Sequence, residues 1–173
     1  NPDDLMIKWE LHHRTGLALQ QFGDINGAMD HWKKAIEISP DTSSEPYYLI
    51  AIGYAGMGKF AEALEYLEKT VQLAPAHTRA FYYLAKLYID KNTGSLYNPK
   101  KAIEYARRAN DLTADKEPVM LEMLAWTYAA DGRYRDAVAT MEKALEYARP
   151  IGVDEHIRRI EHSIALYREG KVE

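Results

Sequence analysis

The hydrophobic positions of the chain recur at helical spacing, and the spacing itself repeats along the sequence. Three segments carry a glycine, an alanine five residues later and then a proline: Gly23 to Pro40, Gly58 to Pro75 and Gly132 to Pro150. The period is 34 or 35 residues, and each unit holds two short amphipathic helices. A period of this length, with two helices per unit, predicts an all-helical stack of hairpins.

A fuller alignment adds a fourth copy of the pattern. The copy at 78–116 has a turn about five residues longer than the others, over 91–98, and Ala114 stands where the others have proline. After the last copy, isoleucines and a tyrosine recur at helical spacing, which predicts a capping helix over 153–168. The four predicted repeats cover residues 9–42, 44–77, 78–116 and 118–150.

Each recurring residue type has a physical reason for its position. Small residues in the first helices let the second helices approach closely, where a large side chain would overpack by roughly 1 to 3 kcal/mol. The glycines suit a turn that needs a positive φ angle, and the prolines stop the second helices. The predicted small crossing positions are Gly16, Ala51, Ala85 and Ala125.

This arrangement of residues resembles the tetratricopeptide repeat family, and the resemblance covers residues 9–150. The resemblance implies a right-handed α-solenoid of four helical hairpins followed by a capping helix. We expect the whole chain, 1–173, to form one such domain. Members of the family generally bind protein partners and carry no catalytic site, so we expect a non-enzymatic scaffold.

A second resemblance concerns the C-terminal third of the chain. An Asn-Pro before a helix, a Leu-Thr before the next hairpin and a closing Leu-Tyr-Arg-x-Gly look like the ends of many large bacterial tetratricopeptide proteins. This resemblance implies a bacterial origin and favours a C-terminal fragment of a longer protein over a complete processed chain. The matching residues are Asn98, Pro99, Leu112, Thr113, Gly132, Arg133, Leu166, Tyr167, Arg168 and Gly170.

Composition narrows the classes of partner and chemistry. There are 22 Lys and Arg against 26 Asp and Glu, a formal net charge of −4, with charges of both signs interspersed. We therefore expect no nucleic-acid partner. With no cysteine, disulfides and thiolate chemistry are excluded. No apolar run is long enough to span a bilayer, so we expect a soluble chain of the bacterial cytoplasm or periplasm that does not insert into membranes.

Two apparent chemical motifs carry little weight. Gly53, Gly58 and Lys59 have the spacing of a phosphate-binding loop, but Phe60 replaces the magnesium-binding hydroxyl and the repeat already explains Gly58. A nucleotide-binding enzyme is thus an unfavoured alternative. The six histidines form no spacing typical of a metal site, so we expect no metal and no cofactor.

The resemblance also places a ligand groove. In the family the first helices of successive repeats line a concave face, and the residues beside each packing position point into it. On this sequence the face has an aromatic floor with a basic centre, which suits a peptide or protein segment. The predicted groove residues are His13, Leu17, Tyr48, Leu49, Ile52, Arg79, Tyr82, Tyr83, Lys86, Glu122, Met123 and Trp126.

Family members that clamp a C-terminal carboxylate use lysine, asparagine and arginine at five of these positions. Of that set, only Arg79 is retained here, so a two-carboxylate clamp is disfavoured. Arg79 and Lys86, about two turns apart on one helix face, still suit an acidic ligand. A structural role is the main alternative: self-association through the uncovered N-terminal hairpin, by way of Leu5, Met6, Ile7 and Trp9.

Overall fold

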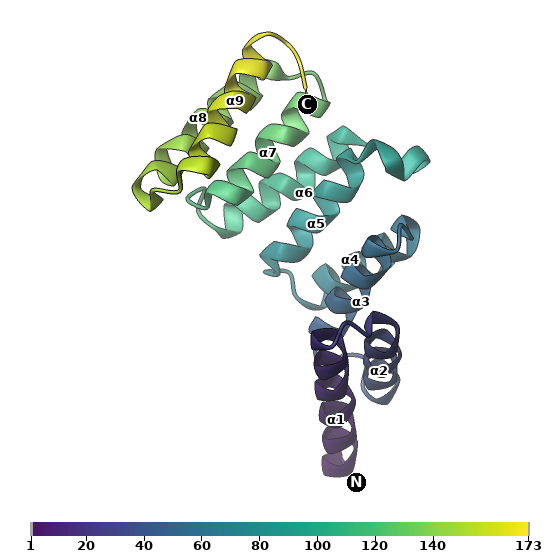
Figure 1. Cartoon of the computed structure of the whole chain (residues 1–173). Helices are drawn as coiled ribbons and strands as arrows, with labels where there is room; N and C mark the ends of the chain where they lie inside the picture. The colour runs from purple at the N-terminus through teal and green to yellow at the C-terminus, as the bar shows by residue number, and fades with distance from the viewer. Residues whose placement is uncertain (1, 173) are drawn as a thin grey trace. The chain divides into compact units, whose positions relative to one another are not determined.

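The structure is a computed structural model that describes residues 2–172. Within these residues it consists of helices and turns without a strand (Figure 1). Two 3-10 segments, η1 (Lys91–Leu96) and η2 (Arg149–Ile151), interrupt the α-helical series. The α-helices are α1 (Pro2–Gln21), α2 (Ile25–Ile38), α3 (Glu45–Gly56), α4 (Phe60–Leu73), α5 (Thr78–Ile89), α6 (Pro99–Leu112), α7 (Pro118–Ala130), α8 (Tyr134–Ala148) and α9 (Asp154–Arg168).

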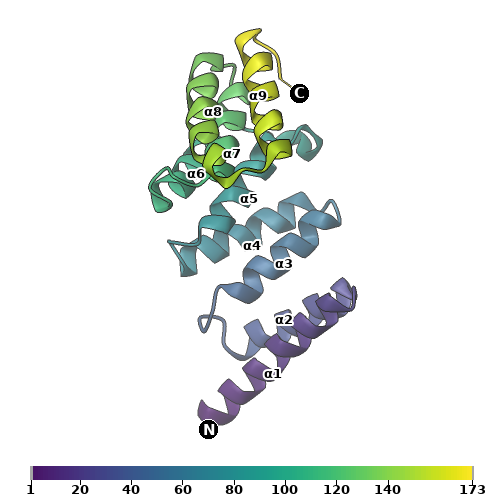
Figure 2. The same ribbon diagram turned by 60° about the vertical axis from the view of Figure 1, so that its left-hand side comes forward.

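Consecutive helices pack as hairpins, as the repeat predicts. α1 packs on α2, α3 on α4, and α7 on α8, and α9 then packs on α8 (Figure 2). In the third hairpin, Tyr88 of α5 stacks on Tyr105 of α6 with ring centroids 5.8 Å apart. The predicted fold class, four helical hairpins followed by a further helix, is thereby confirmed. The chain divides into two compact units, one up to Ala80 and one from Phe81, with the boundary inside α5.

The close crossing inside the first hairpin depends on the absence of a side chain. A Cβ atom built on Gly16 of α1 would lie 2.4 Å from Nε1 of Trp32, which projects from α2. Trp32 itself is only 1 % exposed, so the indole has no room to withdraw. The corresponding alanines at 51, 85 and 125 are fully buried. The prediction of small residues at the helix crossings is therefore confirmed.

The turn glycines adopt the backbone conformation that the pattern predicts. Gly23, Gly58 and Gly132 have φ angles of 83°, 74° and 76°. L-residues with a Cβ rarely adopt this region. The second helices end just before the prolines: α2 at Ile38, α4 at Leu73 and α8 at Ala148.

The third hairpin departs from the repeat at two points, its long internal turn and its end without proline. Its long turn forms η1, in which Asp90 accepts a hydrogen bond from the Asn92 amide and Gly94 has a φ of 61°. Asn98 then caps α6 by accepting from the Lys101 amide at 3.1 Å. The added residues thus fold into an ordered turn that leads directly into the next helix.

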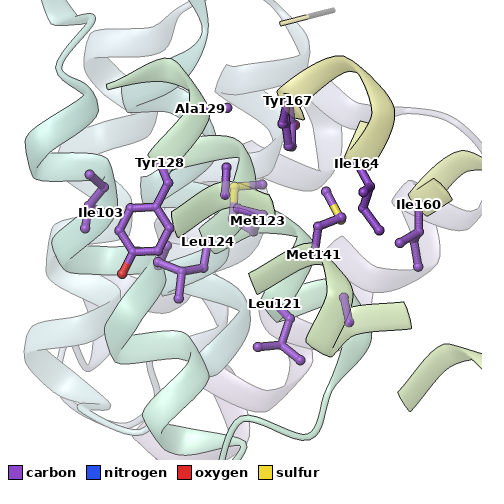
Figure 3. Close-up of a cluster of buried hydrophobic side chains, with 14 of the residues drawn as sticks. Ile103, Leu121, Met123, Leu124, Tyr128, Ala129, Met141, Ile160, Ile164 and Tyr167 are labelled. Atoms are coloured by element: carbon purple, nitrogen blue, oxygen red, sulfur yellow. The ribbon is translucent and has the colours of Figure 1, made fainter. Parts of the chain in front are cut away.

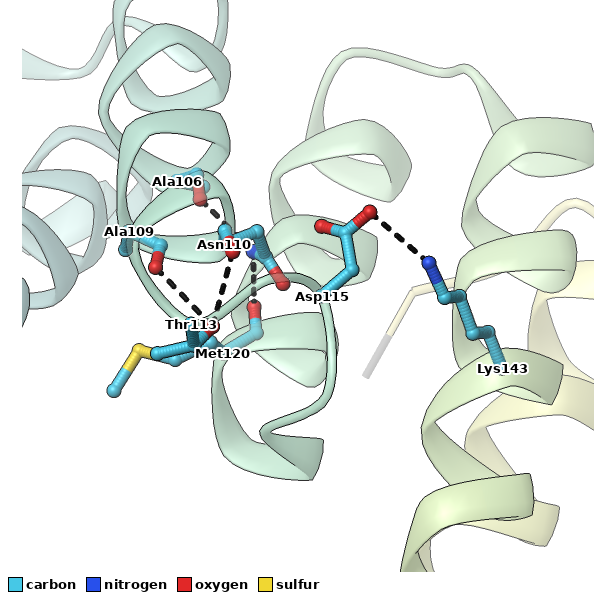
Figure 4. A network of polar contacts seen from close by, with 7 residues as sticks. All are labelled: Ala106, Ala109, Asn110, Thr113, Asp115, Met120 and Lys143. Atoms are coloured by element: carbon cyan, nitrogen blue, oxygen red, sulfur yellow. Dashed lines mark hydrogen bonds and ion pairs between the residues drawn. The ribbon is translucent and has the colours of Figure 1, made fainter.

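Where the other hairpins end at a proline, the third ends in a hydrogen-bond network (Figure 4). Ala114 and Asp115 take positive φ angles of 51° and 54°. The buried Asn110 amide donates to the carbonyls of Ala106 at 2.9 Å and Met120 at 2.8 Å, which joins α6 to α7. Asp115 pairs with Lys143 of α8 at 3.0 Å. These contacts hold the chain reversal that proline promotes elsewhere.

One hydrophobic core runs through the second unit (Figure 3). α7 lies between its neighbours and contributes residues to both sides of this core. Ile160, Ile164 and Tyr167 of α9 close it, as a capping helix should. The first unit has a core of its own around Met29, Trp32 and Ile50.

The Gly16 contact generates a stability prediction. Gly16→Ala should lower the free energy of unfolding by roughly 1–3 kcal/mol, because the new methyl group overlaps the Trp32 indole. Gly56→Ala is the matched control, since a Cβ there meets nothing within 4 Å and alanine favours the helix by up to about 1 kcal/mol. Urea denaturation followed by circular dichroism measures both, and equal stability of the two variants would contradict the crossing argument.

Candidate functional site

All twelve predicted groove residues lie on the first helices of the hairpins. Those of the first unit are His13 and Leu17 on α1, Tyr48, Leu49 and Ile52 on α3, and Arg79 in the first turn of α5. Those of the second unit are Tyr82, Tyr83 and Lys86 on α5, and Glu122, Met123 and Trp126 on α7.

In the first unit, aromatic and charged side chains form a ladder. The Arg79 guanidinium lies 5.2 Å from the centroid of the Tyr48 ring, and Tyr48 lies 4.8 Å from the His77 ring. His77 Nε2 is 3.7 Å from a carboxylate oxygen of Glu45. This set, Glu45, Tyr48, His77 and Arg79, is called the Tyr48 ladder below, and its outer end is the exposed cation Arg79.

The charges of the Tyr48 ladder follow from its contacts. The His77 hydrogen bond is the main cause that lowers the pKa of Glu45, and Arg79 and His13 act in the same direction. Burial lowers the pKa of His13, whose ring stacks on Trp9 with centroids 5.1 Å apart. At neutral pH the ladder therefore contains an ionised Glu45 and a cationic Arg79, and the neighbouring His13 is neutral.

Leu49 and Ile52 of the same unit line a cavity of about 310 Å³. Its walls are mainly apolar and include Trp32, Gly53 and Gly56. A Cβ on Gly53 would lie 2.6 Å from the Met29 sulfur, so a larger residue there would displace the Met29 side chain. The structure thus brings two predicted groove residues together at one apolar hollow.

The second unit has an aromatic cluster on α5. The rings of Tyr82 and Tyr83 meet edge to face at 5.4 Å, and the Lys86 ammonium lies 5.9 Å from the Tyr83 ring centroid. Burial raises the pKa of Tyr82, and the neighbouring Tyr83 and Glu122 add to this. Tyr82, Tyr83 and Lys86, called the Tyr82 cluster below, combine two half-buried phenol rings with one exposed cation.

Glu122 and Met123 are buried, in contrast to the other predicted groove residues on α7 and α5. Met123 is 1 % exposed and belongs to the core that α9 closes, and Glu122 is 2 % exposed. The Glu122 carboxylate pairs with His156 Nε2 and, at 2.8 Å, with the Arg159 guanidinium. Glu122 is the only charged residue of α7, and both partners lie on α9.

The sequence interpretation did not connect His156 and Arg159 with Glu122. A usable signal was present, because the two basic residues lie one turn apart on the predicted capping helix and α7 offers a single acid. The sequence pattern does not give the rotation of α9 about its axis. That rotation decides whether His156 and Arg159 face α7 or solvent.

Trp126 lines a cavity that the residues of the Tyr82 cluster do not line. It is half-buried and lines a cavity of about 410 Å³ together with Tyr97, Tyr134 and Tyr167. All of these residues lie in the second unit.

The positions of the helices also argue against the apparent phosphate-binding motif. Gly53 lies within α3, Gly58 forms a turn with positive φ, and Lys59 precedes α4. A phosphate-binding loop follows a strand, whereas this segment follows a helix.

Among residues 2–172, no three side chains of histidine, cysteine, aspartate or glutamate gather to hold a metal ion. No helix in that range is long and apolar enough to cross a membrane.

Comparison with known families agrees with this geometry. Models described as tetratricopeptide repeat match residues 44–77 and 119–150, which are the second and fourth hairpins. The chain contains tetratricopeptide repeats. Proteins of this family bind protein partners, and in this chain the first helices carry buried or half-buried aromatic rings beside the exposed cations Arg79 and Lys86.

Two curated proteins share sequence with this tetratricopeptide repeat protein. Outer dynein arm-docking complex subunit 4 of Danio rerio is 27% identical over 180 aligned residues, which are 96% of this chain and 36% of the relative. Photosystem I assembly protein Ycf3 of Rippkaea orientalis is 30% identical over 80 residues, 45% of this chain and 46% of the relative. The chain thus spans about a third of the length of the first relative.

Solved structures share the fold of this tetratricopeptide repeat protein. A crystal structure of MamA is 24% identical and superposes with a TM-score of 0.77, covering 94% of this chain and 82% of that one. A thermophilic tetratricopeptide protein of Thermus thermophilus is 20% identical with a TM-score of 0.61, covering 80% and 74%. At this level of identity the likeness concerns the fold.

The Glu122 contacts generate a second stability prediction. Arg159→Met should lower the free energy of unfolding by roughly 1–3 kcal/mol, because a buried carboxylate loses a charged hydrogen-bond donor. Arg158→Met, the neighbouring exposed arginine, should leave stability nearly unchanged. Urea denaturation of the two variants provides the comparison. A stable Arg159→Met variant would show that the pair contributes nothing to closure.

Proposed function

We propose that the protein is a non-enzymatic scaffold that binds a protein segment through the first helices of its hairpins. The observation that carries the proposal is the Tyr48 ladder in the first unit together with the Tyr82 cluster in the second. Tyrosine offers a large contact area at low entropic cost and is enriched among residues that dominate binding energy. Tyr48 itself is buried, so Arg79 is the exposed member of its ladder, whereas both rings of the Tyr82 cluster are half-buried. Each group supports a binding role for the first helices of its own unit.

The charge of these groups indicates what the partner segment carries. Arg79 and Lys86 are exposed cations, each lying over a tyrosine ring. Ring and cation together suit an apolar side chain beside an acidic one. The cavity lined by Leu49 and Ile52 offers further space for an apolar side chain. We therefore propose an acidic, partly apolar protein segment as the ligand.

The geometry revises which predicted residues touch the ligand. Glu122 and Met123 are buried in the second unit, so we assign them to its closure rather than to ligand contact. The proposed contacts on α5 and α7 are Tyr82, Tyr83, Lys86 and Trp126. We propose no reaction for the protein.

A second candidate function, self-association, rests on the exposed apolar residues of α1. Ile7 and Leu11 are 64% and 63% exposed and lie one turn apart, and Leu5 and Met6 are exposed as well. Trp9 differs, because it stacks on His13. The exposed side of α9 is charged, with Arg158 and Glu161 among its residues. We therefore propose that the α1 faces of two copies meet each other, as in an isologous dimer.

The groove proposal predicts the effect of removing its aromatic rings. Tyr82→Ala and Trp126→Ala should each weaken binding by about 1 kcal/mol or more, roughly fivefold, while helical content is kept. Peptides selected by phage display on the parent chain and retested by calorimetry provide the measurement. Phe22→Ala, which removes an exposed ring outside the predicted groove, is the matched control. If both groove variants bind like the parent, the assignment is wrong.

The self-association proposal predicts a concentration-dependent mass. Sedimentation equilibrium at about 5 and 200 µM should show dimers at the higher concentration, since burying apolar surface gains about 25 cal/mol per Å². Ile7→Ser with Leu11→Ser should remain monomeric at both. Val119→Ser, at an exposed valine of α7, should still dimerise. A parent chain that is monomeric throughout contradicts the proposal.

A further inference from the structure

The second unit holds a cavity of about 410 Å³ that the Tyr82 cluster does not line. It lies where the turns of the third and fourth hairpins meet the end of the chain: η1, the end of α7, the Gly132 turn and the residues after α9. Four aromatic rings form its walls, those of Tyr97, Trp126, Tyr134 and Tyr167. Its volume is in the range of about 300–1,000 Å³ that is typical of ligand pockets.

The long third turn builds one wall of this cavity. Tyr97 follows η1, and its hydroxyl donates a hydrogen bond to the Ala130 carbonyl at the end of α7, at 3.4 Å. Lys91 opens the same turn. The extra residues that interrupt the repeat therefore place one aromatic ring and one cation at the cavity.

Small residues line another part of the cavity and leave it unfilled. Ala129 and Ala130 end α7, and Gly132 follows with a positive φ. A Cβ on Gly132 would meet nothing within 4 Å, so no side chain enters from this turn. The chain thus surrounds the space with aromatic rings without occupying it.

The polar groups at the cavity indicate the charge of its occupant. Among the described residues that line it, Lys91 is the only charged one. Lys91 is exposed and forms no ion pair within residues 2–172. An apolar body fits the rings, and an anionic group attached to it matches the lysine.

We propose that this cavity is a second binding site, which takes a large apolar side chain adjoining a carboxylate on a protein partner. The apolar side chain lies among Tyr97, Trp126, Tyr134 and Tyr167, and the carboxylate accepts a hydrogen bond from the Lys91 ammonium. The site shares Trp126 with the proposed groove, but it contains no residue of the Tyr48 ladder or of the Tyr82 cluster. It depends on the irregular third turn, which supplies Lys91 and Tyr97, as well as on repeat residues such as Trp126 and Gly132.

N-acetyl-L-phenylalanine and its uncharged amide are the probes that test the proposal. In spectra of the ¹⁵N-labelled full chain, the acid should shift the indole signal of Trp126 and leave those of Trp9 and Trp32, which lie in the first unit, in place. The acid should bind at least about threefold more tightly than the amide, as expected for one exposed charge pair. Equal affinities, or equal shifts of all three indoles, overturn the proposal.

Two variants separate the charge from the apolar walls. Lys91→Ala should remove the preference for the acid, whereas Lys100→Ala, at an exposed lysine outside the cavity, should keep it. Val172→Asp, on the exposed tail that lines the cavity, should weaken binding of the acid more than binding of the amide, because the new carboxylate repels the anionic probe. A preference that survives Lys91→Ala contradicts the assigned role of the lysine.

A further variant distinguishes this site from the proposed groove. Tyr82→Ala should leave binding of N-acetyl-L-phenylalanine unchanged even though it weakens peptides that bind the groove. Loss of the probe in Tyr82→Ala would show that the cavity is part of the groove and not a separate site. Circular dichroism of each variant confirms that the helices remain folded.

Discussion

The close crossing of the two helices in each hairpin is the constraint on which the rest of the structure depends. Gly16 against Trp32 shows its physical basis, because there is no space for even one methyl group between the two helices. Once this contact fixes which side of each first helix faces its partner, the remaining sides are assigned as well. One side packs against the next hairpin, and another is left to carry tyrosines and cations.

The end of the stack shows what this arrangement requires of its last hairpin. α7 has a side that an additional repeat would cover, and α9 covers it with isoleucines and with His156 and Arg159. The buried Glu122 is tolerated because both carboxylate oxygens have basic partners. The same pairing buries a residue that the sequence assigned to the predicted groove. Closure of the core therefore uses a position of α7 that the repeat pattern alone would leave to the groove.

The irregular parts of the chain contribute differently from the regular ones. Regular hairpins repeat the same contacts, so their differences lie mainly in exposed side chains. The third hairpin has an extra turn and an end without proline, and both are held by specific hydrogen bonds of Asp90, Asn98 and Asn110. The extra turn also supplies Lys91 and Tyr97 to the large cavity. Departures from the repeat thus provide features that the repeat lacks.

The sequence by itself determined the helices, the glycine turns and the small crossing residues, because these follow from local backbone preference and from a period that recurs four times. It also predicted which helices carry the candidate groove, although the full groove remains a prediction. Only the tertiary structure decided that Glu122 and Met123 are buried and that Trp126 lines the cavity beside the third turn. Periodicity identifies which residues share a face of a helix. Their burial depends in addition on the rotation of the neighbouring helix and on the path of an irregular turn.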